Sequence, residues 1–360
     1  MKKLGLLFIS ILGLTACSGN TTGVLFEQTF TVIWQNFDGT ILEKDVDVKL
    51  GSLPSYDGAT PVREGKANYT YEFKGWSPEL IEVTHNVTYT ATYNKVTSTD
   101  DEAYNPVLSS DGKTITYGLY PQSVVKDETL LSNLESLSPT EINDWCFFED
   151  NYYVKKTSNV YNNESYTFND GSAVEQNKEY WFKCEPISWN VLSNDNGKYY
   201  AISSTLLDVH NFYSDYQTRT LNGETILPNN YLYSDVREYL NNEFLETAFT
   251  LSNSFLKSNS DKDKVSLPSK EDMLNTQYSF ENNEDAKSKT RECKSSEYTR
   301  SMGSWVSKET AYKNNGTYWT KSSSGEFDYA SIVVNAGGYL SNYAVDGTSH
   351  SIRPCITIEL

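Results

Sequence analysis

Apolar and polar residues alternate with a period of two in several stretches of the chain, which predicts strands with one buried face. The clearest stretch is 87–93, in which valine, tyrosine and alanine alternate with three threonines. The pair Asp38-Gly39 separates two other apolar stretches and predicts a hairpin turn between them. The first part of the chain is therefore expected to be a small β-rich block with strands at 31–34, 41–48, 69–76 and 87–93.

The longer part of the chain, from about residue 105, shows the same alternation in shorter pieces. Ile187, Trp189 and Val191 alternate with polar residues, and the Asn-Asp-Asn-Gly sequence at 194–197 predicts the turn of a hairpin. Further strands are expected at 114–120, 331–335, 342–345 and 352–360. Charged, polar surface loops are expected at 258–263 and 281–294.

Helical patterns are few in this chain. Ser234 is a good N-cap for a helix over 236–244, where apolar residues recur every four positions. A capping box with proline at the first helical position begins at Ser138, and a third, short helix is expected from Ser269. These elements predict an α+β fold, with a small β-rich domain followed by a larger mixed domain.

The beginning of the chain has a different pattern. Lys2 and Lys3 precede an apolar stretch at 4–14, and Ala16 and Cys17 follow it closely. A basic start, a short apolar core and a small residue at the end are the marks of a secretory signal. The apolar stretch is too short to span a bilayer as a permanent helix, and no other segment is apolar enough to do so.

The end of this leader resembles the lipobox of bacterial lipoproteins, in which leucine, a small or polar residue, and alanine or glycine precede a cysteine. The resemblance implies that the Cys17 thiol is diacylated and that the signal peptide 1–16 is removed. Two fatty chains anchor a protein stably, so we expect the diacylglyceryl cysteine to hold the protein at the extracellular face of the bacterial cell membrane. Residues 17–24 would be the tether. An ordinary signal peptide followed by an unmodified cysteine is the alternative.

The composition is acidic and rich in tyrosine. The formal net charge is −18, and loss of the leader with its two lysines would bring it to −20. This charge argues against electrostatic binding of nucleic acid or of an anionic membrane surface. The 27 tyrosines suit exposed sheets and recognition surfaces, because tyrosine is rigid and has both an apolar ring and a polar end. Most of them are nevertheless expected to fill and flank strands.

Four cysteines remain once Cys17 is assigned to lipid: Cys146, Cys184, Cys293 and Cys355. In an exported protein they allow three pairings, and the sequence leaves disulfides and buried free thiols equally open. None of them forms a C-x-x-C motif, which argues against a zinc site or a thioredoxin-like site. We expect no cofactor and no metal.

The first block resembles one Listeria–Bacteroides repeat, the B-repeat type of the internalins. The resemblance is carried by Thr31-Val32, Asp38-Gly39-Thr40, Pro61-Val62-Arg63-Glu64-Gly65, Phe73-Lys74-Gly75-Trp76 and the closing strand 87–93. It implies a small β-grasp-like module at 25–95, used in surface proteins as a spacer or adhesion unit. Trp34 and Trp76 are expected to be core residues of this module. The polar, acidic stretch 96–104 is expected to be the linker to the second domain.

The second domain, 105–360, resembles an uncharacterised domain of bacterial surface and cell-wall proteins that has no assigned activity. The matching strings are Tyr117-Gly118-x-Tyr120-Pro121-Gln122, Pro186-Ile187-x-Trp189-x-Val191-Leu192, Tyr233-Ser234-x-x-Arg237-x-Tyr239-Leu240-Asn241, Trp319-Thr320-Lys321-Ser322-Ser323 and Ile352-Arg353-Pro354. Its end is also distantly similar to C-type-lectin-like domains of the formylglycine-generating type, which implies a mixed α+β fold with a ligand-binding face. Lys321 stands where that pattern has arginine, and lysine lacks the planar fork for bidentate contacts.

Sequence signatures of enzymes are scarce. The chain has no G-x-S-x-G elbow, no P-loop and no H-E-x-x-H motif. Cys355 and His350 would point to opposite faces of one strand, and a turn explains Asn259, Asp261 and Asp263 better than a calcium site does. We expect that the protein is not an enzyme. An envelope-associated hydrolase or modifying enzyme is the alternative, and a solute-binding lipoprotein would need more helices.

The expected function is that of a binding or adhesion module for a glycan, a wall polymer or a protein. Aromatic side chains in loops before the last strands can stack on sugar rings or anchor a peptide, and polar neighbours can add hydrogen bonds. The candidate ligand-binding residues are Trp305, Tyr318, Trp319, Lys321, Asn335, Tyr339, Tyr343, Asp346 and Arg353. For Trp319 and Arg353 a structural role is favoured over a ligand role: a core tryptophan, and an arginine that ties the last strand to a buried carbonyl or carboxylate.

Overall fold

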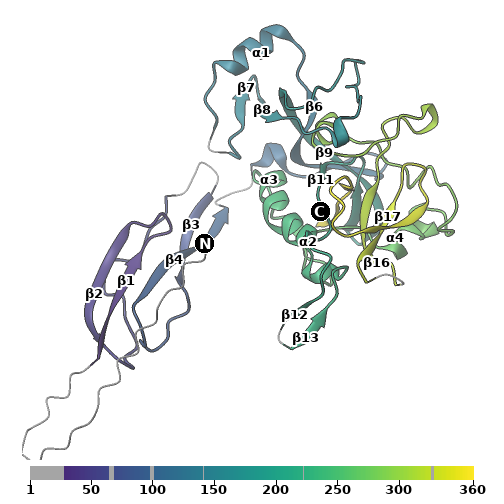
Figure 1. Cartoon of the computed structure of the whole chain (residues 1–360). Coiled ribbons are helices and arrows are strands. Elements are labelled where there is room, and N and C mark those ends of the chain that lie inside the picture. The colour runs from purple at the N-terminus through teal and green to yellow at the C-terminus, as the bar shows by residue number, and fades with distance from the viewer. Residues whose placement is uncertain (1–27, 65–68, 98–100, 141, 222, 326–327) are drawn as a thin grey trace, which may run out of the picture. The chain divides into compact units, whose positions relative to one another are not determined.

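The computed structural model in Figure 1 describes residues 28–64, 69–97, 101–140, 142–221, 223–325 and 328–360. The chain divides into two compact units, the first of which ends at Lys95. The fold is mixed and rich in β-structure, with several sheets and few helices, as the sequence patterns predict. The expected leader, Cys17 and the tether lie outside the described residues. No helix within the described ranges is long and apolar enough to cross a membrane.

The smaller unit is one mixed four-stranded sheet. Its strands are β1 (Thr29–Gln35), β2 (Ile41–Lys49), β3 (Tyr69–Ser77) and β4 (Val87–Thr97), in the order β2-β1-β4-β3. β1 and β2 form the hairpin predicted at Asp38-Gly39, where Gly39 adopts a positive φ of 84°. β1 and β4 run parallel at the centre of the sheet. All four strands lie where the alternation predicts them.

Trp34 is the centre of the core of the smaller unit. It is fully buried, its ring stacks on Tyr89 with 4.8 Å between the ring centres, and Trp76 meets it edge to face at 4.8 Å. The indole N–H donates a hydrogen bond of 2.9 Å to the Asp45 carboxylate, which satisfies the one polar atom of the buried ring. The expected core role of Trp34 is confirmed, while Trp76 is only partly buried and packs against this core.

The larger unit contains two sheets and a separate hairpin that projects from it in Figure 1. The nine strands of the first sheet are β5 (Val107–Leu108), β6 (Thr114–Val124), β7 (Cys146–Phe148), β8 (Asn151–Thr157), β9 (Glu179–Asp195), β10 (Lys198–Ser203), β14 (Leu256–Lys257), β15 (Val265–Ser266) and β20 (Cys355–Glu359). The five strands of the second are β11 (Asp208–Val209), β16 (Tyr318–Ser323), β17 (Ala330–Val334), β18 (Leu340–Ala344) and β19 (Ser351–Ile352). The hairpin consists of β12 (Arg219–Leu221) and β13 (Glu224–Ile226).

The chain passes from one sheet to the other just before its end. The sequence predicts one strand over 352–360, but β19 belongs to the five-stranded sheet and β20 to the nine-stranded sheet. Arg353 and Pro354 make the crossing, and proline suits it because it cannot donate a ladder hydrogen bond. The predicted hairpin between β9 and β10 is confirmed, with Asn196 and Gly197 at positive φ of 52° and 91° in its turn.

Helices in the larger unit are short. The α-helices are α1 (Glu128–Glu135), α2 (Asp235–Tyr239), α3 (Leu245–Ala248), α4 (Lys270–Met273) and α5 (Glu297–Ser301), and a π-helical turn, Leu240–Phe244, joins α2 to α3. Short 3₁₀ helices lie at Glu102–Tyr104, Tyr161–Asn163, Tyr231–Tyr233, Thr276–Tyr278 and Thr310–Tyr312. Two predicted helix starts are confirmed, because Ser234 caps α2 and Ser269 forms a capping box at α4.

The helix predicted from Ser138 is wrong. The N–H of Thr140 donates to the carbonyl of Trp145 at 2.7 Å and closes a loop there. Asn143 and Asp144 have positive φ values of 52° and 56°, which a right-handed helix does not accept. The helix in this region is α1, which begins earlier and is capped by Asp127 through a 2.7 Å hydrogen bond from the Leu130 N–H.

The stretch expected as the linker is partly built into the two units. β4 of the smaller unit runs through Thr97. Asp101 already belongs to the larger unit, because its N–H donates to the Leu251 carbonyl at 2.8 Å and its side chain caps the 3₁₀ helix Glu102–Tyr104. The described residues at the two ends of 96–104 therefore belong to strand and helix rather than to the linker that the sequence predicts.

The cysteines of the larger unit are free thiols. All four are buried: Cys146, Cys184, Cys293 and Cys355. Of the alternatives that the sequence leaves open, the structure has buried thiols rather than disulfides. Burial raises the pKa of each of them, so none is a reactive thiolate at neutral pH.

Candidate functional site

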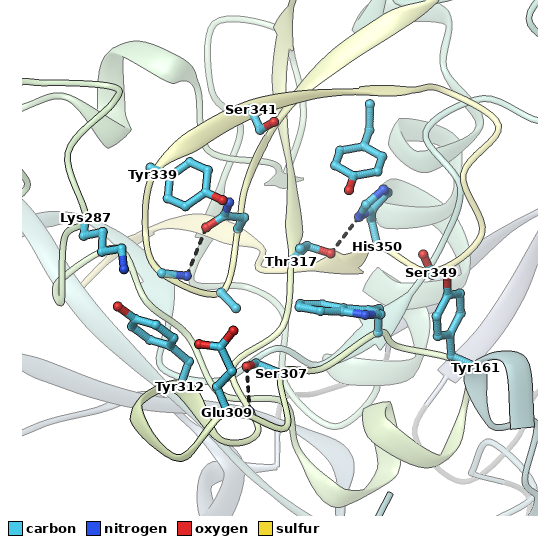
Figure 2. A pocket seen from close by; sticks show the side chains of 15 residues that line it. Tyr161, Lys287, Ser307, Glu309, Tyr312, Thr317, Tyr339, Ser341, Ser349 and His350 are labelled. Carbon is cyan, nitrogen blue, oxygen red and sulfur yellow. Dashed lines mark hydrogen bonds between the residues drawn. The ribbon is translucent and has the colours of Figure 1, made fainter. Parts of the chain in front are cut away.

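A pocket of about 400 Å³ lies beside the turn that joins β17 to β18 and the loops that precede β16 and β19 (Figure 2). Its walls combine aromatic rings with hydroxyl and amide groups. The aromatic side chains that line it are Tyr161, Trp305, Tyr312, Tyr339 and Tyr343. The volume and the mixture of apolar walls with a few polar groups are typical of sites for small molecules.

The turn between β17 and β18 shapes one wall of the pocket. The Asn335 side-chain oxygen accepts from the Gly337 N–H at 3.0 Å, and the Asn335 N–H donates to the Tyr339 carbonyl at 3.0 Å. Gly338 has a positive φ of 80°, and a Cβ on it would overlap the carbonyl of Ser288. Only glycine fits there for both reasons, and the tight turn places the Tyr339 ring in the wall.

Arg291 holds the neighbouring loop against this turn. It is fully buried, and each of its five side-chain N–H groups has a backbone carbonyl as partner. Nε donates to Gly338 at 2.5 Å, while the two terminal nitrogens donate to Met273, Glu281, Asn283 and Ala286 at 3.2, 2.7, 2.9 and 2.7 Å. The Arg291 guanidinium thus fixes the loop that contains Lys287, a residue that lines the pocket.

His350 lies on the inner side of the pocket and is almost completely buried. Its Nδ1 is 2.6 Å from the Thr317 hydroxyl, and its ring contacts Trp319 and Tyr343 with ring centres 4.6 and 4.4 Å apart. Burial lowers the pKa of His350 to about 4, because an imidazolium loses hydration there. The ring is therefore neutral at neutral pH.

The charged groups of the pocket lie at one end of it. Figure 2 shows Lys287 and Glu309 near Tyr312, while Tyr161, Ser349 and His350 lie at the other end. The Lys287 ammonium is 5.1 Å from the centre of the Tyr312 ring, and the hydrogen bond with Tyr312 raises the pKa of Lys287. A ligand would thus meet one cation and one anion at this end and uncharged groups at the other.

Four of the predicted ligand-binding residues line this pocket: Trp305, Asn335, Tyr339 and Tyr343. Tyr339 and Tyr343 keep 38% and 49% of their surface exposed, so their rings are accessible to a ligand. The backbone N–H of Trp305 donates to the Ser349 carbonyl at 2.9 Å, and this bond joins the loop after α5 to the loop before β19. The structure therefore brings together residues that are up to 38 positions apart in the sequence.

Tyr318, Trp319 and Arg353 are buried and do not line the pocket. The Trp319 indole N–H donates to the His210 carbonyl at 2.8 Å. Arg353 donates to the Ser203 carbonyl at 3.0 Å and to the Tyr318 hydroxyl at 3.0 Å. These contacts match the structural role expected for Trp319 and Arg353. The tryptophan lies in the core, and the arginine connects the segment between β19 and β20 to the buried carbonyl of Ser203.

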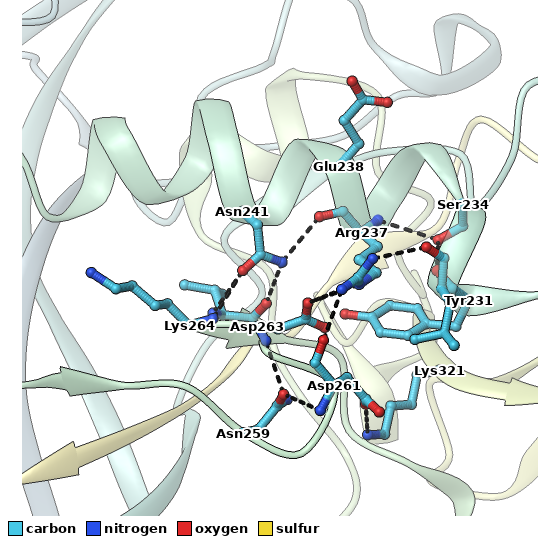
Figure 3. Close-up of polar contacts among 12 residues, drawn as sticks. Tyr231, Ser234, Arg237, Glu238, Asn241, Asn259, Asp261, Asp263, Lys264 and Lys321 are labelled. Carbon is cyan, nitrogen blue, oxygen red and sulfur yellow. Dashed lines mark hydrogen bonds and ion pairs between the residues drawn. The ribbon is translucent and has the colours of Figure 1, made fainter. Parts of the chain in front are cut away.

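Lys321 and Asp346 also lie outside the pocket. The Lys321 ammonium forms a 2.8 Å ion pair with Asp261 (Figure 3), and Asp346 is an exposed residue of the turn after β18. Lys321, a residue of β16, therefore binds the 258–263 loop and does not line the pocket.

The 258–263 loop contains a turn, as the sequence predicts, and ion pairs that the sequence did not predict hold it. The Asn259 side chain accepts from the N–H groups of Asp261 and Asp263 at 2.8 and 3.0 Å, and Arg237 pairs with the Asp263 carboxylate at 2.7 Å (Figure 3). Each carboxylate thus has a cationic side chain as partner. Among the residues that the structure describes, no group of acidic, histidine or cysteine side chains is arranged to hold a metal.

Sequence reasoning missed most of the other residues of the pocket. Tyr161 and Tyr312 lie in 3₁₀ helices, and Lys287 lies in a stretch predicted only to be a surface loop. Such segments have no periodicity that predicts which way their side chains point. His350 was noted in the sequence, but nothing there indicates that it is neutral and buried.

The comparisons with known proteins give no relative for this chain: no family model, curated protein or solved structure matches it. The structure itself defines a β-rich protein of two units whose larger unit has an aromatic-lined pocket.

Proposed function

We propose that the chain is a lipid-anchored extracellular protein whose larger unit binds a saccharide in the pocket of Figure 2. The observation that carries the proposal is the lining, in which five aromatic side chains stand among hydroxyl and amide groups. A sugar ring has apolar C–H faces and a rim of hydroxyls. Aromatic rings match the faces, and serine, threonine and asparagine side chains match the rim.

The chemistry of the pocket favours binding over catalysis. Thr317 and His350 are the residues there that most resemble a nucleophile and a base, since their side chains are 2.6 Å apart. A useful general base has a pKa near the working pH. Burial lowers the pKa of His350 to about 4, so its ring is a poor acceptor for a hydroxyl proton. This low basicity supports the binding module over the hydrolase.

Alanine at Tyr339 or Tyr343 should weaken saccharide binding about tenfold or more, because truncation of an aromatic anchor removes most of its contact area. Both rings are partly exposed, so the melting temperature should stay close to that of the parent chain. The full chain would be tested on arrays of glycans and wall polymers, and in parallel with ester, glycoside and peptide substrates for turnover.

Tyr216→Ala is the matched control, because Tyr216 is an exposed tyrosine outside the pocket. Retention on the array that is lost with Tyr339→Ala but kept with Tyr216→Ala would support the proposal. Turnover of any substrate class, or equal retention by all variants, would contradict it. Unfolding caused by both pocket substitutions would assign the two rings a structural role.

The anchor is proposed from the resemblance of the leader to a lipobox. Cys17→Ser removes the thiol that would carry the lipid, so the protein should no longer incorporate labelled palmitate and should leave the cell surface. The prediction is checked by labelling cells that express each form and by comparing the membrane and medium fractions. A parent chain found wholly in the medium would contradict the anchor. Cys146→Ser is a control for the loss of a different cysteine.

We further propose that the two units have the roles that their resemblances imply. The smaller one would be a β-grasp-like spacer of the Listeria–Bacteroides type, and its mixed sheet with the parallel pair β1 and β4 is compatible with that. The larger one would be the uncharacterised surface-protein domain, distantly like C-type-lectin-like domains. In this arrangement the spacer holds the saccharide pocket away from the membrane.

A further inference from the structure

A second cavity of about 260 Å³ lies in the larger unit beneath the π-helical turn Leu240–Phe244. Its walls include four aromatic side chains: Tyr120, Trp145, Tyr239 and Tyr298. Two carboxylates, Asp208 and Glu243, also line it, together with one lysine, Lys156. None of these residues lines the saccharide pocket, so the two cavities are separate.

Asp208 is the inner carboxylate of this cavity. Its Oδ2 accepts a short hydrogen bond from the Tyr120 hydroxyl and a 2.7 Å hydrogen bond from the Tyr239 hydroxyl. Its Oδ1 accepts from the N–H of Val209 at 2.8 Å. A carboxylate offers about four acceptor positions, so Oδ1 retains one. Burial raises the pKa of Asp208, and the two phenols oppose that rise.

The two phenol oxygens lie within hydrogen-bond distance of each other and of Asp208. Each tyrosine has one hydroxyl proton, and both hydroxyls are donors to Asp208 Oδ2. The oxygens of Tyr120 and Tyr239 are also 3.0 Å apart, where either can donate to the other. Asp208 Oδ1 and the remaining lone pairs of the two phenols are acceptors that a group with several N–H donors can satisfy.

The π-helical turn places two of these groups. Tyr239 and Glu243 are four residues apart, stand just before and within the turn, and both line the cavity. The side-chain amides of Asn241 and Asn242 donate to the carbonyls of Arg237 and Glu238 at 3.1 and 2.9 Å. These bonds stabilise a wider turn that is rare in proteins and recurs at functional sites.

We propose that this cavity binds the primary ammonium group of a small organic amine. These acceptors would take its N–H donors, Glu243 would add a second negative charge, and the buried rings of Trp145 and Tyr298 would contact the cation. Lys156 is the one positive side chain that lines the cavity, and it is exposed, as Glu243 is. The two carboxylates outnumber this one cation. The local charge therefore remains negative and favours a cation.

Calorimetric titration of the full chain with two chloride salts tests this. Ethylammonium has three N–H donors, whereas tetramethylammonium has the same charge and none. We expect ethylammonium to bind at least about tenfold more tightly, because buried acceptors that stay unpaired lose roughly 1–3 kcal/mol. Equal affinity for the two ions, or no binding of ethylammonium, would overturn the proposal.

Substitutions then locate the site. Asp208→Asn and Glu243→Gln should each weaken ethylammonium binding by about tenfold, since each keeps the shape and removes one charge. Glu246→Gln is the matched control, because Glu246 is exposed on the same helical segment and does not line the cavity. If the Asp208→Asn variant does not fold, Tyr239→Phe is used in its place. It removes one hydroxyl oxygen from the cavity and should also weaken ethylammonium binding. Binding that is unchanged in Glu243→Gln and Tyr239→Phe would contradict the assignment.

Discussion

Arg291→Lys should lower the free energy of unfolding of the larger unit by about 3 kcal/mol or more. Arg291 gives one N–H to each of five backbone carbonyls, whereas a lysine ammonium has only three donors, all on one nitrogen. At least two buried carbonyls would lose their partners, and each unpaired group costs about 1–3 kcal/mol. The measurement is equilibrium unfolding of the full chain in denaturant.

Lys289→Met provides the control for this experiment, because Lys289 is an exposed cation of the same loop. It should change the unfolding free energy by no more than about 0.5 kcal/mol. Arg291→Lys should also weaken ligand binding in the pocket, because the loop with Lys287 loses its fixed position. A destabilisation below about 1 kcal/mol would mean that the arginine does not organise the loop.

His350→Gln should make the stability of the larger unit less dependent on pH in the acid range. The pKa of His350 falls from 6.5 to about 4 on folding, so the unfolded chain takes up a proton below pH 6.5 and the folded chain does not until about pH 4. Stability is therefore lost as the pH falls through this interval, by about 3 kcal/mol in total. Glutamine does not titrate and removes that contribution.

The quantity to compare is the difference in unfolding free energy between pH 7 and pH 4.5. It should be larger for the parent chain than for His350→Gln, whatever the stability of the variant at pH 7. His85→Gln serves as the control, because His85 is exposed in the smaller unit and its substitution should leave the difference unchanged. If the difference in unfolding free energy between pH 7 and pH 4.5 were the same in the parent chain, His350→Gln and His85→Gln, the pKa of His350 would not be lowered by folding.

The strands of the smaller unit were predictable because they alternate between a more buried and a more exposed face. In β4, Tyr89 and Ala91 are buried while Thr88 is exposed and Thr90 and Thr92 are half-buried, and this alternation is visible in the sequence. The same reasoning failed at Ser138. A capping box and a proline favour a helix start, but the loop contact between Thr140 and Trp145 prevails there. Local preference is weaker than tertiary contacts in such cases.

The candidate site was predictable only in part. Trp305, Tyr339 and Tyr343 were selected as aromatic residues in loops before the last strands, and they do line one pocket. Tyr318 was selected by the same criterion and is fully buried. The chemical type of a side chain does not reveal which way an irregular loop turns it. Arg291 shows the converse, because an arginine in a charged stretch is among the most buried residues of the chain.

The free thiols have a practical meaning for the larger unit. Since Cys146, Cys184, Cys293 and Cys355 are all unpaired and enclosed, the larger unit does not need an oxidising compartment or a thiol oxidase to reach its native state. Reductants have no cross-link to cleave among these four residues. The same shape is thus accessible in the reducing cytosol and in the medium outside the cell, which makes the larger unit indifferent to the redox potential of its surroundings.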